Sequence, residues 1–193
     1  PKDKTVEEKI GTSNLMNIST EEYTYVKGLS LDIYFKHLEN NDTEKAYNML
    51  SKEYKEYKPY KSYLEDISKI NLEDITIKDI KRKSEYSFVA NINVNGIEKK
   101  YLIYKDELND KVFKISPDSF INFYLSSFDF KKSGLYFKVN NYLIEIDRIV
   151  VSIKIENKTN KDTIEIAEIN AITNKGNSNG LDKKITLKPG ENL

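Results

Sequence analysis

The chain has 193 residues, of which 38% are hydrophobic and 32% are charged, a balance typical of a folded chain with room for one large domain or two small ones. Lys and Arg together number 31, as do Asp and Glu, and arginine occurs only at Arg82 and Arg148, so the composition argues against a nucleic-acid-binding protein. There is no cysteine, which excludes disulfides, thiolate metal sites and cysteine nucleophiles.

The N-terminal stretch has no apolar periodicity, and we expect residues 1–17 to form a flexible, solvated tether. The chain begins at Pro1 in a polar run, and it contains no stretch of about 18 apolar residues. We favour the interpretation that a signal peptide or membrane anchor has been removed, the alternative being an ordinary trimmed terminus. On this interpretation the protein is extracytoplasmic, membrane-anchored or at the cell surface, and it meets the membrane only through the removed N-terminal anchor.

The first predicted helix begins at a well-marked cap. Ser19 and Glu22 form a capping box, and apolar residues then recur at helical spacing: Leu31, Tyr34, Phe35 and Leu38. We expect this helix to run to about Glu39, with Gly28 permitting a bend or the close approach of another element.

Two further helices are predicted before the pattern changes. Asn41, followed by Glu44, predicts the N-cap of the second helix, and Pro59 fits the first turn of the third. Their inward faces are Ala46, Met49, Leu50 and Tyr54 in the second helix, and Tyr60, Tyr63, Leu64, Ile67 and Ile70 in the third. Beyond these helices the hydrophobic period falls from about 3.6 to about 2 residues, which indicates strands.

A β-hairpin is the clearest strand signal in the chain. Asn95-Gly96 is a residue pair that favours a type I′ turn, which places Val94 opposite Ile97 and fixes the register of both strands. One face of this hairpin then carries Tyr86, Phe88, Ala90, Ile92 and Val94 together with Ile97, Tyr101 and Ile103.

Small and polar residues from Ser126 to Gly134 predict a boundary between a domain at residues 18–127 and a second domain at residues 134–193. Just before the boundary, the segment from Ser116 to Tyr124 fits either a short helix or a strand. Beyond it the pattern is wholly β, with Ile149, Val151, Ile153 and Ile155 on one face, turns at 157–162 and 188–190, and a flexible loop at 174–180. A further strand is expected after the last of these turns.

The sequence therefore predicts an α+β fold in which three helices precede a curved antiparallel sheet. This order resembles the nuclear transport factor 2-like (NTF2-like) cone, the fold of ketosteroid isomerase, and the segment LDIYFKHLENNDTEKAYNMLSKEY is similar to the opening helices of its bacterial extracytoplasmic members. The tail resembles the immunoglobulin-like domains of Gram-positive lipoproteins, on the turns NKTNK at 157–161 and KPGE at 188–191. The resemblance implies a cone domain followed by a small all-β, sandwich-like domain.

The candidates for catalysis are few. His37 is the single histidine, so a catalytic triad or histidine–metal site would have to be built around it. It lies beside the apolar face of the first predicted helix, and we interpret it as a partly exposed structural residue. No Asp stands on an inward strand face where the resemblance to ketosteroid isomerase would require a base. We therefore predict no catalytic residue, no metal site, no cofactor and no enzymatic activity.

The 14 tyrosines suggest an aromatic pocket at the mouth of the cone. The candidate ligand-binding residues are Tyr34, Tyr47, Tyr63, Tyr86 and Tyr101. The alternative is that tyrosine serves as the edge of the core in a chain that has no tryptophan.

The sequence best supports a non-catalytic, extracytoplasmic, envelope-tethered binding or assembly module of a Gram-positive bacterium, with a protein or cell-wall partner and no nucleic acid. Its oligomeric state is left open. The alternative is a small-molecule lyase, isomerase or ligand-binding protein that uses the cone pocket. A pocket of several hundred Å3 with a buried carboxylate would favour the alternative, whereas a cone filled by Tyr and Phe would favour the module.

Overall fold

The computed structural model describes residues 15–146, 148–166, 169–173, 176–181 and 185–193. Five α-helices in the described chain precede mostly antiparallel strands, which confirms the α+β class. The chain divides into two compact units: the described residues up to Phe123 with Leu143–Val150, and Tyr124–Tyr142 with Val151–Leu193. It therefore crosses between the units three times, whereas the sequence suggested a single boundary at Ser126–Gly134.

The first helix, α1 (Thr20–Leu29), begins at the predicted cap. The Oγ of Ser19 accepts a hydrogen bond from the backbone N–H of Glu22 at 3.2 Å, which satisfies one of the free donors of the first turn. The carboxylate of Glu22 does not complete the box by reaching back, because it pairs with Arg82 on β2 (Ile75–Ser84). Glu22, the second residue of the predicted capping box, thus links α1 to the sheet through its ion pair with Arg82.

The long first helix predicted up to Glu39 is in fact two helices, because the chain breaks at Ser30 before α2 (Leu31–Glu39). Ser30 is buried with φ −118° and ψ −84°, and its hydroxyl donates to the carbonyl of Val26 at 2.5 Å. Gly28, where a bend or close approach was expected, remains inside α1, and no heavy atom would lie within 4 Å of a Cβ added there. A buried serine that bonds the preceding turn, rather than a glycine, ends the helix.

The second and third predicted helices are three helices in the structure: α3 (Thr43–Asn48), α4 (Lys52–Tyr57) and α5 (Tyr60–Ile67). Asp42 precedes α3, and the predicted cap Asn41 instead has φ 58°, the left-handed conformation common just after a helix. Ser51 starts α4 by accepting a hydrogen bond from the N–H of Tyr54 at 3.1 Å. Pro59, predicted in the first turn of this helix, instead lies one residue before α5 at its N-cap.

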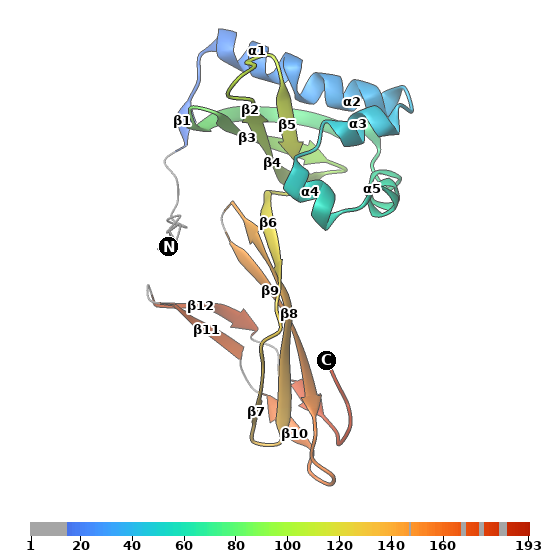
Figure 1. The fold of residues 1–193 in the computed structure, drawn as a ribbon, viewed down its shortest axis with the longest axis vertical. Helices are drawn as coiled ribbons and strands as arrows, with labels where there is room; N and C mark the ends of the chain where they lie inside the picture. The colour runs from blue at the N-terminus through green and yellow to red at the C-terminus, as the bar shows by residue number, and fades with distance from the viewer. Residues whose placement is uncertain (1–14, 147, 167–168, 174–175, 182–184) are drawn as a thin grey trace. The chain divides into compact units, whose positions relative to one another are not determined.

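The sheet of the first unit has five strands in chain order, all antiparallel: β1 (Met16–Asn17), β2, β3 (Ser87–Val94), β4 (Ile97–Lys105) and β5 (Phe113–Ser116). Figure 1 shows α1 and α2 lying over this sheet, and their buried residues form one core with those of the strands. A one-turn 3-10 helix, Leu72–Asp74, connects α5 to β2. Residues 1–14 of the predicted tether lie outside the described residues, and its last two form β1.

The predicted hairpin and its register are confirmed. Val94 pairs with Ile97, Ala90 pairs with Tyr101, and the turn residues Asn95 and Gly96 have φ of 54° and 79°. Tyr86 is the exception, since it lies with Glu85 in the turn between β2 and β3 and not on the strand face.

The segment from Ser116 to Tyr124 forms strand β6 (Phe120–Leu125), so the helix considered for it is wrong. Asp118 and Ser119 both have positive φ, at 57° and 63°, a pair of left-handed residues that no right-handed helix accommodates. The hydroxyl of Ser116 donates to the carbonyl of Phe120 at 2.7 Å and holds this tight turn.

The strands beyond β6 are β7 (Asp129–Lys132), β8 (Leu135–Glu145), β9 (Ile149–Asn157), β10 (Ile164–Ile166), β11 (Ile169–Thr173), β12 (Gly176–Leu181) and β13 (Ile185–Leu187). Strand β8 pairs with β6, β7 and β9, while β10 pairs with β13 and β11 with β12. Within the second unit, Leu135, Ile155 and Leu187 form a small core to which β8, β9, β10 and β13 contribute. The loop predicted at 174–180 is strand β12 from Gly176 onward, and residues 174–175 lie outside the described ones.

The face predicted for β9 is only partly buried. Ile155 is 2% exposed, but Ile149, Val151 and Ile153 are between 37% and 48% exposed. Alternation identified the strand correctly but did not show where along its length the core lies.

The predicted turn after β9 is built around Asn157, which is fully buried. Its amide donates to the carbonyls of Asp162 and Leu187 at 2.8 and 2.9 Å, and its Oδ1 accepts from the N–H of Thr159 at 2.9 Å. Gly134 lies against this turn, and its carbonyl accepts from the N–H of Lys158 at 2.8 Å. One buried amide thus satisfies three backbone groups in and beside the turn.

The first prediction concerns the hairpin turn. Gly96→Ala should lower the free energy of unfolding by about 1 kcal/mol, because Gly96 has φ 79° and no neighbour that a methyl group would contact. Gly28→Ala is the matched control and should raise it by about 0.5–1 kcal/mol, since Gly28 lies inside a helix with free space around it. Equilibrium urea unfolding measures both, and an unchanged Gly96→Ala variant would exclude the type I′ turn.

The second prediction concerns the turn after β9. A Cβ on Gly134 would lie 2.4 Å from Cγ2 of Thr159 at a φ of 79°, so Gly134→Ala should cost about 2 kcal/mol or more. Adding Thr159→Ser removes that methyl but keeps the hydroxyl that bonds Asn157, and it should recover the part of the loss due to the clash. A double variant no more stable than Gly134→Ala would show that the contact with Thr159 is not what destabilises Gly134→Ala.

Candidate functional site

The first unit contains a pocket of about 360 Å3. Its lining comes from α2, α4, α5 and the residues that follow α5, from the β3–β4 hairpin, and from the turn between β5 and β6. The pocket thus opens where helix ends meet the inner face of the sheet. Its volume lies at the lower end of the roughly 300–1,000 Å3 typical of small-molecule sites.

Four tyrosines form the buried lining of this pocket: Tyr34, Tyr54, Tyr63 and Tyr101. Each is at most 4% exposed. The hydroxyls of Tyr34 and Tyr63 lie 3.2 Å apart and share a hydrogen bond. Three of the five tyrosines predicted for a pocket, Tyr34, Tyr63 and Tyr101, are therefore brought together by the fold.

The other two predicted tyrosines do not line the pocket. Tyr47 lies behind it, with its ring centroid 5.2 Å from that of Tyr63 and its hydroxyl donating to the carbonyl of Lys58 at 3.0 Å. This contact makes Tyr47 a support for a lining residue. Tyr86 is 36% exposed in the turn between β2 and β3, and it is not among the residues that line the pocket.

Tyr54 is the lining residue that the sequence did not single out. It lies on the inward face of its helix with Ala46 and Leu50, and from that spacing it was interpreted as core. The ring does pack in the core, 5.5 Å from that of Phe120, while the residue also borders the pocket. The signal was available in principle, since a tyrosine on a core face needs somewhere to place its hydroxyl.

Burial keeps the lining tyrosines neutral. Desolvation raises the pKa of Tyr34, Tyr54 and Tyr101 well above the ordinary value for a phenol, and the negative charge of Asp118 adds to this for the last two. Burial also raises the pKa of Tyr63 to about 12. At neutral pH the pocket therefore presents phenol hydroxyls that can donate hydrogen bonds and carry no charge.

Charged side chains surround the mouth of the pocket: Lys58, Asp66, Lys69, Lys99 and Asp118. Lys58 donates to Asp66 at 2.7 Å, and Lys69 lies 3.6 Å from the same carboxylate. Lys99 pairs with Asp118 at 2.8 Å. The hydrogen bond from Lys58 lowers the pKa of Asp66, so this carboxylate stays ionised.

These carboxylates are poor candidates for a general base. The side chains of Asp66 and Asp118 are 43% and 54% exposed, and each is paired with a lysine. A base that works near neutral pH needs a raised pKa, whereas that of Asp66 is lowered. A pocket that held a buried carboxylate would have favoured an enzyme. Both carboxylates that line this pocket, those of Asp66 and Asp118, are exposed.

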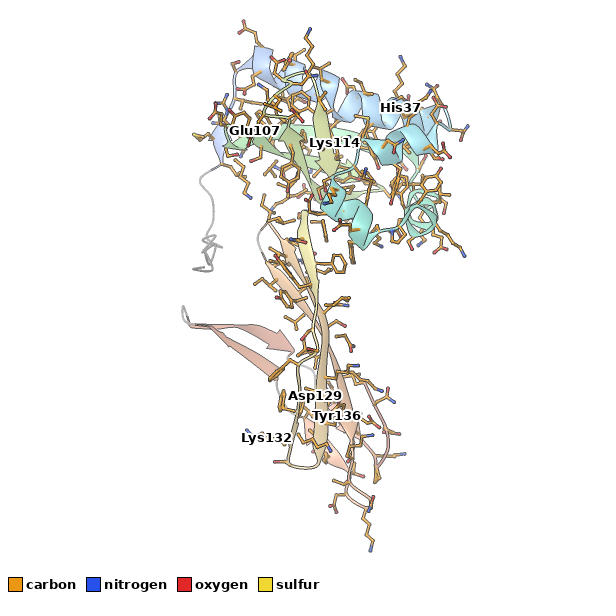
Figure 2. The ribbon with its side chains drawn as sticks, in the orientation of Figure 1. His37, Glu107, Lys114, Asp129, Lys132 and Tyr136 are labelled. Atoms are coloured by element: carbon orange, nitrogen blue, oxygen red, sulfur yellow. The ribbon has the colours of Figure 1, made fainter. Side chains whose placement is uncertain are left out.

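His37 is on α2, where Figure 2 labels it, and it is not among the residues that line the pocket. It is partly exposed, as predicted, and its Nδ1 is 3.9 Å from the carboxylate of Asp42. In the part of the chain that the structure describes, no group of three or more His, Asp or Glu side chains is placed to hold a metal ion. Nor does any helix among those residues have the length and apolar character to cross a membrane.

Comparison of the chain with protein-family models, with curated proteins and with solved structures finds no match.

The third prediction concerns the ionisation of the pocket tyrosines. In the unfolded chain these phenols ionise at the ordinary pKa of about 10. Because their pKa is raised in the folded protein, the neutral phenols contribute fully to stability below about pH 10. That contribution is lost as pH rises through the raised values, about 12 for Tyr63. Ultraviolet absorbance of phenolate should therefore show fewer ionised tyrosines near pH 11 in the folded protein than in denaturant. Identical titration curves in the two states would contradict the burial of these hydroxyls.

Proposed function

We propose that this protein is a non-catalytic binding module and that its first unit holds a small ligand in the tyrosine-lined pocket. The observation that carries the proposal is the pocket of about 360 Å3 lined by Tyr34, Tyr54, Tyr63 and Tyr101. Aromatic side chains give such a site apolar contact area, and their hydroxyls give it directional polar contacts.

Binding without catalysis is favoured by the state of the charged groups. The lysines and aspartates at the mouth are engaged in ion pairs, and the phenols are too weakly acidic to ionise near neutral pH. The pocket can therefore position a ligand but offers no group poised for proton transfer. A lyase or isomerase remains the competing candidate, and it would need a base that the ligand itself or a partner supplies.

For the fold, we propose that the first unit is an NTF2-like cone and that the second is immunoglobulin-like. Helices followed by an antiparallel sheet with a pocket between them support the cone. The single core to which β8, β9, β10 and β13 contribute supports a small sandwich in the second unit.

We also propose an extracytoplasmic, envelope-tethered location in a Gram-positive bacterium, with a protein or cell-wall partner for the second unit. The support is the composition, rich in Lys, Asn, Ile and Tyr, and the resemblance of the turns at 157–161 and 188–191 to those of lipoprotein domains. Nucleic acid is not proposed as a partner, because positive and negative side chains balance.

The fourth prediction tests whether the pocket binds. A screen of aromatic and polar fragments, followed by heteronuclear NMR, should give shifts that cluster on the lining residues. Ile97→Trp should abolish these shifts, because Ile97 is 62% exposed at the pocket, where a larger ring can occupy the mouth.

The control for this experiment is Ile33→Trp, since Ile33 is an exposed aliphatic residue on α2 that does not line the pocket. His37→Gln is a second control, and both should leave fragment binding unchanged. Fragment shifts that survive in Ile97→Trp, or that disappear in His37→Gln, would show that the fragments bind outside this pocket.

A further inference from the structure

The hydroxyls of the pocket tyrosines are not fully used by the protein. In the described chain, Tyr34 and Tyr63 share one hydrogen bond, while the hydroxyls of Tyr54 and Tyr101 make none. Four phenolic protons and one internal hydrogen bond leave three protons without an acceptor among the described residues. No fully enclosed polar side-chain atom of these residues lacks a partner, so the two unpaired hydroxyls open onto the pocket that they line.

The carboxylate and amide side chains that line the pocket, by contrast, already have partners. Asp66 accepts from Lys58, and Asp118 is paired with Lys99. The amide of Asn95 is used at both ends: its Oδ1 accepts from the N–H of Asn71 at 2.9 Å, and its Nδ2 donates to the carbonyl of Lys69 at 2.8 Å. The hydroxyls of Tyr54 and Tyr101 therefore remain to donate to an acceptor that the ligand brings.

This imbalance discriminates between classes of ligand. A sugar carries several hydroxyls that each donate as well as accept, so it requires more polar partners than two phenols supply. A carbonyl or carboxylate group only accepts, which matches the unpaired protons of Tyr54 and Tyr101.

The net charge at the mouth favours an anion over a neutral carbonyl. Asp118 opposes a negative charge at the hydroxyls of Tyr54 and Tyr101, and its partner Lys99 offsets part of that repulsion. The three lysines Lys58, Lys69 and Lys99 face the two aspartates Asp66 and Asp118, which leaves one positive charge. The pKa of Lys58 is raised by its hydrogen bond to Asp66, so this lysine stays charged. A single negative charge on the ligand would balance the group.

The remaining lining is apolar and limits the rest of the ligand. Ile67, Ile70, Val94, Ile97 and Pro117 surround the pocket beside the tyrosine rings. The volume of about 360 Å3 suits a compact molecule rather than a polymer chain.

We propose that the pocket binds a small monocarboxylate with an apolar body, whose carboxylate accepts hydrogen bonds from the hydroxyls of Tyr54 and Tyr101. This inference rests on the proposed function, since it names the class of ligand for the same pocket. Hydrogen bonds from neutral donors to a charged acceptor are stronger than those to a neutral one, so the carboxylate makes the best use of two unpaired phenols.

The test compares three probes: hydrocinnamate, its neutral amide hydrocinnamamide, and N-acetylglucosamine. Titration followed by heteronuclear NMR should show hydrocinnamate binding in the pocket about tenfold more tightly than the amide, and the sugar should not bind. Equal affinity for the acid and the amide would show that the pocket recognises a neutral carbonyl rather than a carboxylate, and would overturn the proposal. Binding of the sugar alone would overturn the class.

The hydroxyls are tested one at a time. Tyr54→Phe and Tyr101→Phe should each weaken hydrocinnamate binding about tenfold, whereas Tyr86→Phe removes a hydroxyl outside the pocket and should have no effect. Neither pocket variant should lower the urea midpoint of the ligand-free protein, because the hydroxyl it removes has no partner in the described chain. A purely structural hydroxyl would give the opposite result, with stability lost and affinity kept.

The charge is tested with a pair of exposed lysines. Lys69→Glu reverses the net charge at the mouth and should weaken hydrocinnamate binding about threefold while leaving the amide unchanged. Lys61→Glu changes the total charge equally from an exposed position on α5 outside the pocket, and it should have no such effect.

The outcomes separate the two proposals. If aromatic or polar fragments bind the pocket but hydrocinnamate does not, the pocket function stands and the ligand class is wrong. If no fragment of any class shifts the lining residues, the proposed function itself fails.

Discussion

The turn at Asn95-Gly96 sets the register of β3 and β4, and the rest of the first unit depends on that register. A slip of one residue would turn Tyr101 and Lys99 away from the pocket, because successive side chains of a strand point to opposite faces. The same turn is held to the end of α5 by the side chain of Asn95, which bonds the backbone of Lys69 and Asn71. The residues that make the strongest hairpin signal thus also position the helix that supplies Tyr63 and Asp66.

The tyrosines of the pocket combine two roles that compete. Their rings complete the core between α2, α4 and the sheet, and a phenylalanine would serve that purpose without an unpaired hydroxyl. The hydroxyls of Tyr34 and Tyr63 bond each other, whereas those of Tyr54 and Tyr101 open onto the pocket, where the ligand that we propose would meet them.

The second unit is held by different means. Its core is small, with Leu135, Ile155 and Leu187 as the buried apolar residues among those described, and a buried asparagine fastens the turn that connects its strands. Gly134 must lie against that turn with no side chain, since Thr159 occupies the space that a Cβ would need. Hydrogen bonds from a buried side chain to the backbone therefore help to stabilise the second unit, whereas a large aromatic core stabilises the first.

The sequence by itself determined the features that depend on neighbours in the chain. The cap at Ser19 and the type I′ turn with its register were predicted correctly, and the start of α5 was predicted to within one residue, because each depends on a few adjacent residues. Tertiary structure decided the rest. Ser30 breaks a continuous helical pattern, Tyr86 falls in a turn, and Lys58, Asp66 and Asp118 meet around Tyr54 and Tyr101 from separate segments. Residues far apart in sequence become neighbours only when the helices pack on the sheet, and periodicity, which reports which face is buried, does not report what that face will meet.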